Sequence, residues 1–118
     1  MPSNLMMFFI LGVLLMTSCS DDDTTQIDCT GVTPTYSSEI APIINVSCAF
    51  SGCHDSATKS DGIDLSTYAN VKSASANDNF LKSIKHESGA TAMPQSAEKL
   101  PNESIKMIEC WIQNGWPQ

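Results

Sequence analysis

The feature that most constrains this 118-residue chain is a pair of cysteines with a histidine directly after the second, in the run Cys48-Ala49-Phe50-Ser51-Gly52-Cys53-His54. Two thiols and an imidazole so close together have few ordinary uses in a protein. They form a disulfide, contribute to a zinc site or attach a haem. The rest of the chain must fold around whichever of these occupies the run.

Covalent haem attachment needs two thiols for the two vinyl groups and an imidazole directly after the second thiol, so that attachment aims a ring nitrogen at the iron. The usual spacing is Cys-x-x-Cys-His, whereas this chain has four residues between Cys48 and Cys53. The adjacency of Cys53 and His54 is intact, and Gly52 helps the longer loop to bend. The motif therefore favours one covalent haem c. A zinc site completed by Cys29 or Cys110 and a plain Cys48–Cys53 disulfide are the alternatives.

A haem iron bound by His54 has a second axial position. After the first 18 residues only two methionines remain, Met93 and Met107. Met107 falls inside a helical pattern, while Met93 lies in a loop before Pro94, which holds it extended. His86 is the only other histidine and would give a bis-histidine site. Met93 is favoured as the distal ligand, and a thioether there implies a higher reduction potential.

The composition also points to a chain that needs help to fill its interior. Residues 19–118 contain only 17 Val, Ile, Leu and Phe and carry the whole formal charge of −7. Such a chain struggles to fold unaided, which excludes a large enzyme with a deep core, a two-domain protein and a multi-pass membrane protein. With 13 acidic residues, six lysines and no arginine, it lacks the basic footprint that nucleic-acid binding requires.

The N-terminus predicts export and lipid attachment. The 12-residue apolar run from Leu5 to Met16 is too short to cross a bilayer but suits a signal peptide. It leads into Leu15-Met16-Thr17-Ser18-Cys19, which resembles the lipobox of bacterial lipoproteins. The resemblance implies a signal peptide over 1–18 and a lipid anchor on Cys19. An ordinary cleavable signal is the alternative. Residues 1–4 carry no Lys or Arg, whereas such signals normally have a positive start, which indicates either a late start of the sequence or a weak signal.

The residues after Cys19 bear on location and domain organisation. Ser20-Asp21-Asp22-Asp23 resembles an acidic export tag of some Gram-negative lipoproteins. The resemblance implies a cell-envelope protein anchored to the outer membrane, either periplasmic or surface-exposed. A solvated spacer is the alternative. The polar stretch 19–35 predicts a flexible tether that is pinned at Cys29, which leaves one domain over 36–118.

Apolar spacing in this domain predicts helices and no strand. The first helix is expected to be capped by Ser37 or Ser38 and to lead into Cys48, and a second short helix is expected to be capped by Ser66. The third is expected over about 78–86 and the last over about 102–114, ending before Gly115. Their apolar positions are Ile40, Ile43, Ile44 and Val46; Tyr68, Ala69 and Val71; Phe80, Leu81 and Ile84; and Ile105, Ile108 and Ile112. The fold class predicted is small all-α.

Taken in order, five segments resemble the small cytochrome c domains of bacterial lipoproteins, of the planctomycete type: 36–44, 48–54, 62–68, 92–94 and 105–112. The resemblance implies a small cytochrome c fold wrapped around one covalent haem. Cys48 and Cys53 would hold that haem, with His54 as the proximal and Met93 as the distal iron ligand. It also implies electron transfer with a redox protein partner.

Two cysteines remain after these assignments, and four envelope cysteines in principle allow three pairings. Because the terminal helices cross in cytochrome c folds, the resemblance implies a disulfide between Cys29 and Cys110. Two functions other than electron transfer stay open. Without Met93 on the iron the haem would react with peroxide or bind a gas, and without haem the chain would be a disulfide-stapled binding lipoprotein. The chain has no obvious cluster of catalytic acid, base and nucleophile, which favours a carrier over an enzyme.

Overall fold

The structure is a computed structural model that describes residues 26–118. The predicted signal peptide, the predicted lipidation site Cys19 and the acidic residues after it lie outside the described residues. Within 26–118 the regular elements are all helical and no strand is present. The predicted all-α class is therefore confirmed for this part of the chain.

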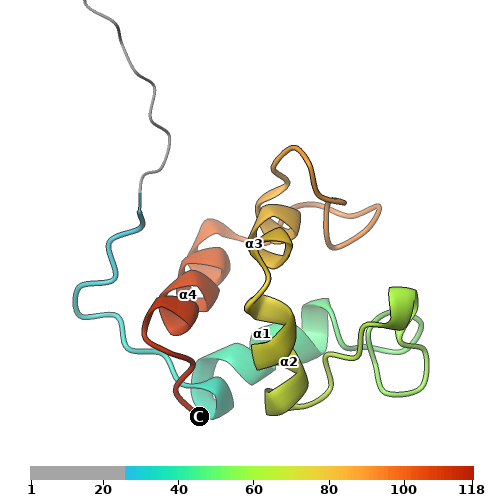
Figure 1. Ribbon diagram of the computed structural model, residues 1–118, viewed down its shortest axis with the longest axis horizontal. Coiled ribbons are helices and arrows are strands. Elements are labelled where there is room, and N and C mark those ends of the chain that lie inside the picture. Colours follow the sequence, from blue (N-terminus) through green and yellow to red (C-terminus); the bar gives the residue numbers. More distant parts are fainter. Residues whose placement is uncertain (1–25) are drawn as a thin grey trace, which may run out of the picture.

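Four α-helices and two short helical turns make up the domain (Figure 1). A π-helical turn, Tyr36–Ile40, continues directly into α1, Ala41–Ser47, and a 3₁₀ turn occupies Ser60–Gly62. The other helices are α2, Tyr68–Ser75; α3, Asp78–Lys85; and α4, Asn102–Gln113. The π-helical turn and α3 both contact α4, and α2 contacts α3. Among the described helices none is both long enough and apolar enough to span a bilayer.

The first helical stretch begins earlier than expected, because its cap is Thr35 and not Ser37 or Ser38. The Thr35 hydroxyl accepts a hydrogen bond from the backbone N–H of Ser38, at 3.4 Å, and the Thr35 N–H donates to Oε2 of Glu39, at 2.7 Å. Two backbone donors that a helix start leaves unpaired are thereby satisfied. Ser37 and Ser38 are both exposed.

Thr35→Ala tests this cap. We expect it to lower the free energy of unfolding by about 1 kcal/mol, because the hydroxyl that accepts from the Ser38 N–H is lost. Ser37→Ala is the matched control and should change stability by less than about 0.5 kcal/mol, as surface substitutions usually do. Denaturant unfolding of both variants measures the difference. Equal effects of the two substitutions would show that Thr35 does not cap the helix.

The second predicted cap also differs from the observed one, in this case by one residue. Thr67, not Ser66, caps α2, and its hydroxyl accepts from the Asn70 N–H at 3.3 Å. Ser66 is bound instead to the carboxylate of Asp64 through both its N–H and its hydroxyl. Because that local pairing occupies the Ser66 side chain, the next hydroxyl along the chain takes the cap.

The core lies where α1, α2, α3 and α4 meet. Its buried members are Ile40, Ile44, Leu65, Val71, Ile84, Leu100, Ile105, Ile108 and Trp111. Most of the predicted apolar positions are among them or pack against them. Val46 and Ala69 are the exceptions, since Ala69 is exposed on α2 and Val46 is 76% exposed near the end of α1. The spacing of Val46 matches the buried face only loosely, and the helix ends one residue later.

The C-terminal residues fasten the helices together. α4 ends as predicted before Gly115, which has the positive φ of 82° that suits glycine. The following carbonyls then accept three hydrogen bonds of 2.8–2.9 Å: the Trp116 carbonyl accepts from the Tyr68 hydroxyl, and the Pro117 carbonyl accepts from the Trp111 indole and the Tyr36 N–H. The chain end therefore ties α2, α4 and the π-helical turn to one another.

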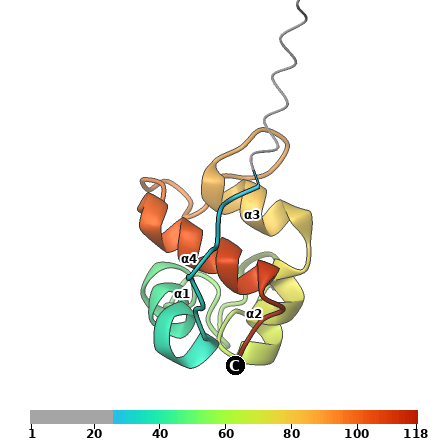
Figure 2. The ribbon, with the colours of Figure 1, turned by 90° about the vertical axis from the view of Figure 1, so that its left-hand side faces the viewer.

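The segment before the first helix runs across α4 (Figure 2). Cys29 and Cys110 form a disulfide with a Cα–Cα distance of 5.5 Å, and Asn114 Nδ2 donates to the Val32 carbonyl at 3.0 Å. The predicted pairing is thus confirmed. The described part of the predicted tether is held against α4 from Cys29 onward.

Candidate functional site

The end of α1 places the first cysteine of the motif. The Cys48 N–H donates to the Ile44 carbonyl at 2.8 Å, which completes the last turn, and the chain then leaves the helix. The loop closes on itself because the His54 N–H donates to the Cys48 carbonyl at 3.0 Å and the Cys53 N–H to the Phe50 carbonyl at 3.1 Å. Both cysteines are free thiols and partly buried. The two thiols and the imidazole are therefore brought together by backbone hydrogen bonds.

A second loop, residues 55–65, folds back over the first. The Ser60 N–H donates to the Cys53 carbonyl at 2.9 Å and the Leu65 N–H to the His54 carbonyl at 2.8 Å. Gly52 has a φ of 89°, the left-handed conformation that the predicted bend requires, and its N–H donates to the Thr58 hydroxyl. These hydrogen bonds fix the second loop against the backbone of Gly52, Cys53 and His54.

His54 is only 8% exposed, and its ring orientation is defined by one hydrogen bond. Its Nδ1 lies 3.1 Å from the Ile63 carbonyl oxygen. A carbonyl oxygen only accepts, so Nδ1 carries the proton and donates it. In a neutral imidazole the other nitrogen, Nε2, then holds the free lone pair, which is the arrangement that a metal-ligating histidine uses.

Both thiols of the motif are unpaired, and the Cys48 thiol is largely removed from solvent. Burial raises the pKa of the Cys48 thiol to about 11, with a further contribution from the nearby Cys53. The Cys48 side chain is therefore a neutral thiol near pH 7. The alternative of a Cys48–Cys53 disulfide is not the arrangement found, because both sulfurs are unpaired.

The zinc alternative requires ligands that the fold uses elsewhere. Cys29 and Cys110, the two cysteines that would complete the site, are bonded to each other. In residues 26–118 no group of three or more His, Cys, Asp or Glu side chains is placed to share a metal ion. Cys48, Cys53 and His54 are joined through the backbone of their loop, but their side chains do not form such a metal-binding group in the described chain.

Met93, the predicted distal ligand, lies in the loop between α3 and α4 and is partly buried. In Figure 1 this loop (orange) lies at the upper right and the Cys48–Leu65 loops (green) at the lower right. Glu87 and Lys99 of the α3–α4 loop line a groove together with the N-terminal segment. His86, the alternative ligand, is exposed and terminates α3. Met107 packs against the core from α4, in agreement with its helical pattern.

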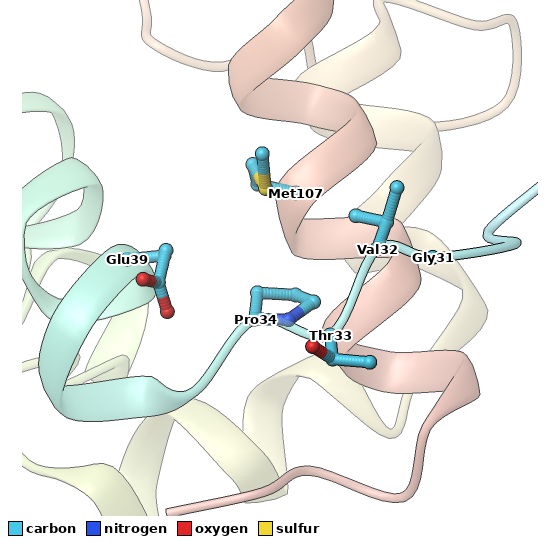
Figure 3. A pocket seen from close by; sticks show the side chains of 6 residues that line it. All are labelled: Gly31, Val32, Thr33, Pro34, Glu39 and Met107. Atoms are coloured by element: carbon cyan, nitrogen blue, oxygen red, sulfur yellow. The ribbon is translucent and has the colours of Figure 1, made fainter.

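Two hollows of the described surface lie away from the motif. One, of about 200 Å³, lies between the N-terminal segment and α4 and is lined by Gly31, Val32, Thr33, Pro34, Glu39 and Met107 (Figure 3). A larger open groove of about 630 Å³ adjoins the ends of α3 and α4 near Gln26. Neither is lined by Cys48, Cys53, His54 or Met93.

Large apolar side chains are exposed beside the motif. Val46 is 76%, Phe50 46% and Ile63 42% exposed. Val46 comes two residues before Cys48, Phe50 lies between the cysteines, and Ile63 supplies the carbonyl bound to His54. Sequence reasoning missed Ile63, and no sequence signal identifies it, because every residue carries a carbonyl.

A search of protein-family models, curated proteins and solved structures finds no match to this chain.

Proposed function

We propose that this protein is a monohaem c-type cytochrome that transfers electrons, with the haem attached through Cys48 and Cys53 and His54 as the proximal iron ligand. The orientation of the His54 ring carries the proposal. Its Nδ1–H is bound to the Ile63 carbonyl, which leaves Nε2 with a lone pair on the residue that directly follows Cys53, and both cysteines of the motif are free thiols.

The surroundings of the motif fit a porphyrin. Both thiols are unpaired, which thioether formation with the two vinyl groups requires. The exposed Val46, Phe50 and Ile63 provide apolar surface next to them, and covering that surface would remove it from water. The cytochrome c fold around one haem is part of this proposal, and the helical architecture of residues 26–118 is compatible with it.

Each residue has a separate task in the proposed site. A bound haem supplies one-electron transfer by cycling between ferrous and ferric iron. Cys48 and Cys53 hold the group in place, and the Ile63 carbonyl keeps the His54 ring from turning. Met93 offers its thioether to the distal side. If His54 and Met93 both bound the iron, they would leave it no free position for a substrate, which supports a carrier over an enzyme.

The proposed setting is the cell envelope. A lipid on Cys19 would attach the protein to the outer membrane, on its periplasmic or outer face, and a redox protein would be its partner. Mass spectrometry of the purified N-terminal peptide tests the lipid directly. A peptide that begins at Cys19 with added acyl groups supports it.

Met93→Ala tests the distal ligand. We expect the wild-type ferric protein to show the weak long-wavelength absorption band of a methionine-bound haem and the variant to lose it. The reduction potential should fall, because the thioether stabilises the reduced iron. Met107→Leu is the matched control and should retain the band, since Met107 packs against the core. High-spin ferric iron in the wild type would instead support the peroxidase or gas-binding alternative.

A further inference from the structure

We infer that His86 is a positioning residue that holds Met93 in place for the iron. The inference rests on the proposed function, since it assigns a task within that same site. It is carried by the contacts that Met93 makes with the end of α3.

Met93 is held at both of its backbone polar groups. Its N–H donates to the Ser83 carbonyl at 3.0 Å, and its carbonyl oxygen lies 3.0 Å from Nε2 of His86. Both partners belong to the end of α3. That helix is itself anchored, because Ile84 is buried in the core and Lys85 is paired with Glu109 of α4 at 2.8 Å. Met93 is therefore bound to a fixed element although it lies in a loop.

The hydrogen bond also decides which nitrogen of His86 holds a proton. The Met93 carbonyl only accepts, so Nε2 of His86 carries the proton, and in a neutral ring the lone pair lies on Nδ1. Ligation through Nε2 would break the contact that holds Met93.

The backbone at His86 decides which substitution tests the hydrogen bond cleanly. His86 ends α3 in the left-handed conformation, with a φ of 58°. Glycine adopts this conformation without strain at a helix C-terminus.

The experiment compares His86→Gly with His86→Gln in the full-length haem-loaded protein. Glycine removes the ring at a position that suits glycine, so the variant reports the lost hydrogen bond and not a strained backbone. Glutamine retains a side-chain N–H donor. Each ferric variant is titrated with imidazole, which competes with Met93 for the iron. The long-wavelength methionine band is followed during the titration.

We expect His86→Gly to bind imidazole about fivefold more tightly than the wild type, as the loss of one ordinary hydrogen bond implies. His86→Gln should return the affinity to within about twofold of the wild type. Glu87→Ala, at the next exposed residue, is the matched control and should leave the affinity unchanged. The imidazole affinity reports how easily Met93 is displaced from the iron, so a substitution that affects only folding stability should leave it unchanged.

Three results would overturn the inference. Unchanged imidazole affinity in His86→Gly would show that the contact does not hold Met93. Equal affinities in the glycine and glutamine variants would show that the hydrogen bond is not the cause. If His86→Gly abolishes low-spin iron while Met93→Ala leaves the wild-type spectrum intact, His86 is the ligand. A colourless wild-type protein refutes the proposed function itself, and with it this assignment, and is recognised before any titration.

Discussion

The double replacement Cys48→Ser and Cys53→Ser is expected to abolish covalent haem entirely. A serine hydroxyl does not form the thioether that links the polypeptide to the porphyrin, so the group should separate from the denatured chain. A haem stain of the denatured polypeptide and its intact mass measure this. The wild type should stain and carry the mass of one haem, and the variant should do neither.

The matched control replaces the other pair of cysteines. Cys29→Ala with Cys110→Ala also removes two cysteines but leaves both proposed attachment thiols, so its haem stain should persist. A wild-type polypeptide without stain or added haem mass would contradict the proposed function. The protein would then be the haem-free, disulfide-stapled binding lipoprotein.

Loss of haem should also weaken the fold. The buried apolar cluster has nine members, and Val46, Phe50 and Ile63 are exposed beside the motif. A porphyrin against them would add apolar contact that the polypeptide does not supply by itself. We therefore expect the Cys48→Ser, Cys53→Ser protein to lose its cooperative melting transition. A cooperative transition at the wild-type temperature would show that the polypeptide core is sufficient.

Removal of the Cys29–Cys110 disulfide is expected to lower the free energy of unfolding by about 4 kcal/mol. The bond joins residues 81 positions apart, and a cross-link over so long a loop restricts the unfolded chain strongly in the chain-entropy model. Alanine is preferred to serine because the Cys110 side chain is fully buried, and a hydroxyl there would add its own cost. Denaturant unfolding of the Cys29→Ala, Cys110→Ala protein measures the change.

The visible spectrum provides the control for this second experiment. Cys29 and Cys110 join the N-terminal segment to α4 and do not take part in the proposed haem attachment, so the spectrum of the folded variant should match the wild type. A loss of less than about 1 kcal/mol in the free energy of unfolding would show that the disulfide between the N-terminal segment and α4 contributes little to stability. A changed spectrum would show that α4 shifts when the bond is absent.

Helix positions were predictable where the pattern is local. The spacing of Phe80, Leu81 and Ile84 predicted a helix over 78–86, and α3 spans Asp78–Lys85. Periodicity over two or more turns is sufficient for this, because it reflects one buried face. The caps were predicted less well. Thr35 and Thr67 cap their helices because of bonds with Glu39 and Asn70, while neighbouring serines of equal propensity are exposed or paired elsewhere.

The amino-acid sequence by itself determined the all-α class and the adjacency of two thiols and an imidazole, because both depend on spacing within a few residues. Only the tertiary structure decided which cysteines pair, since Cys29 and Cys110 meet through the path of the chain across α4. It alone decided which nitrogen of His54 carries the proton, because the acceptor is a backbone carbonyl nine residues away that the 55–65 loop brings back to the ring.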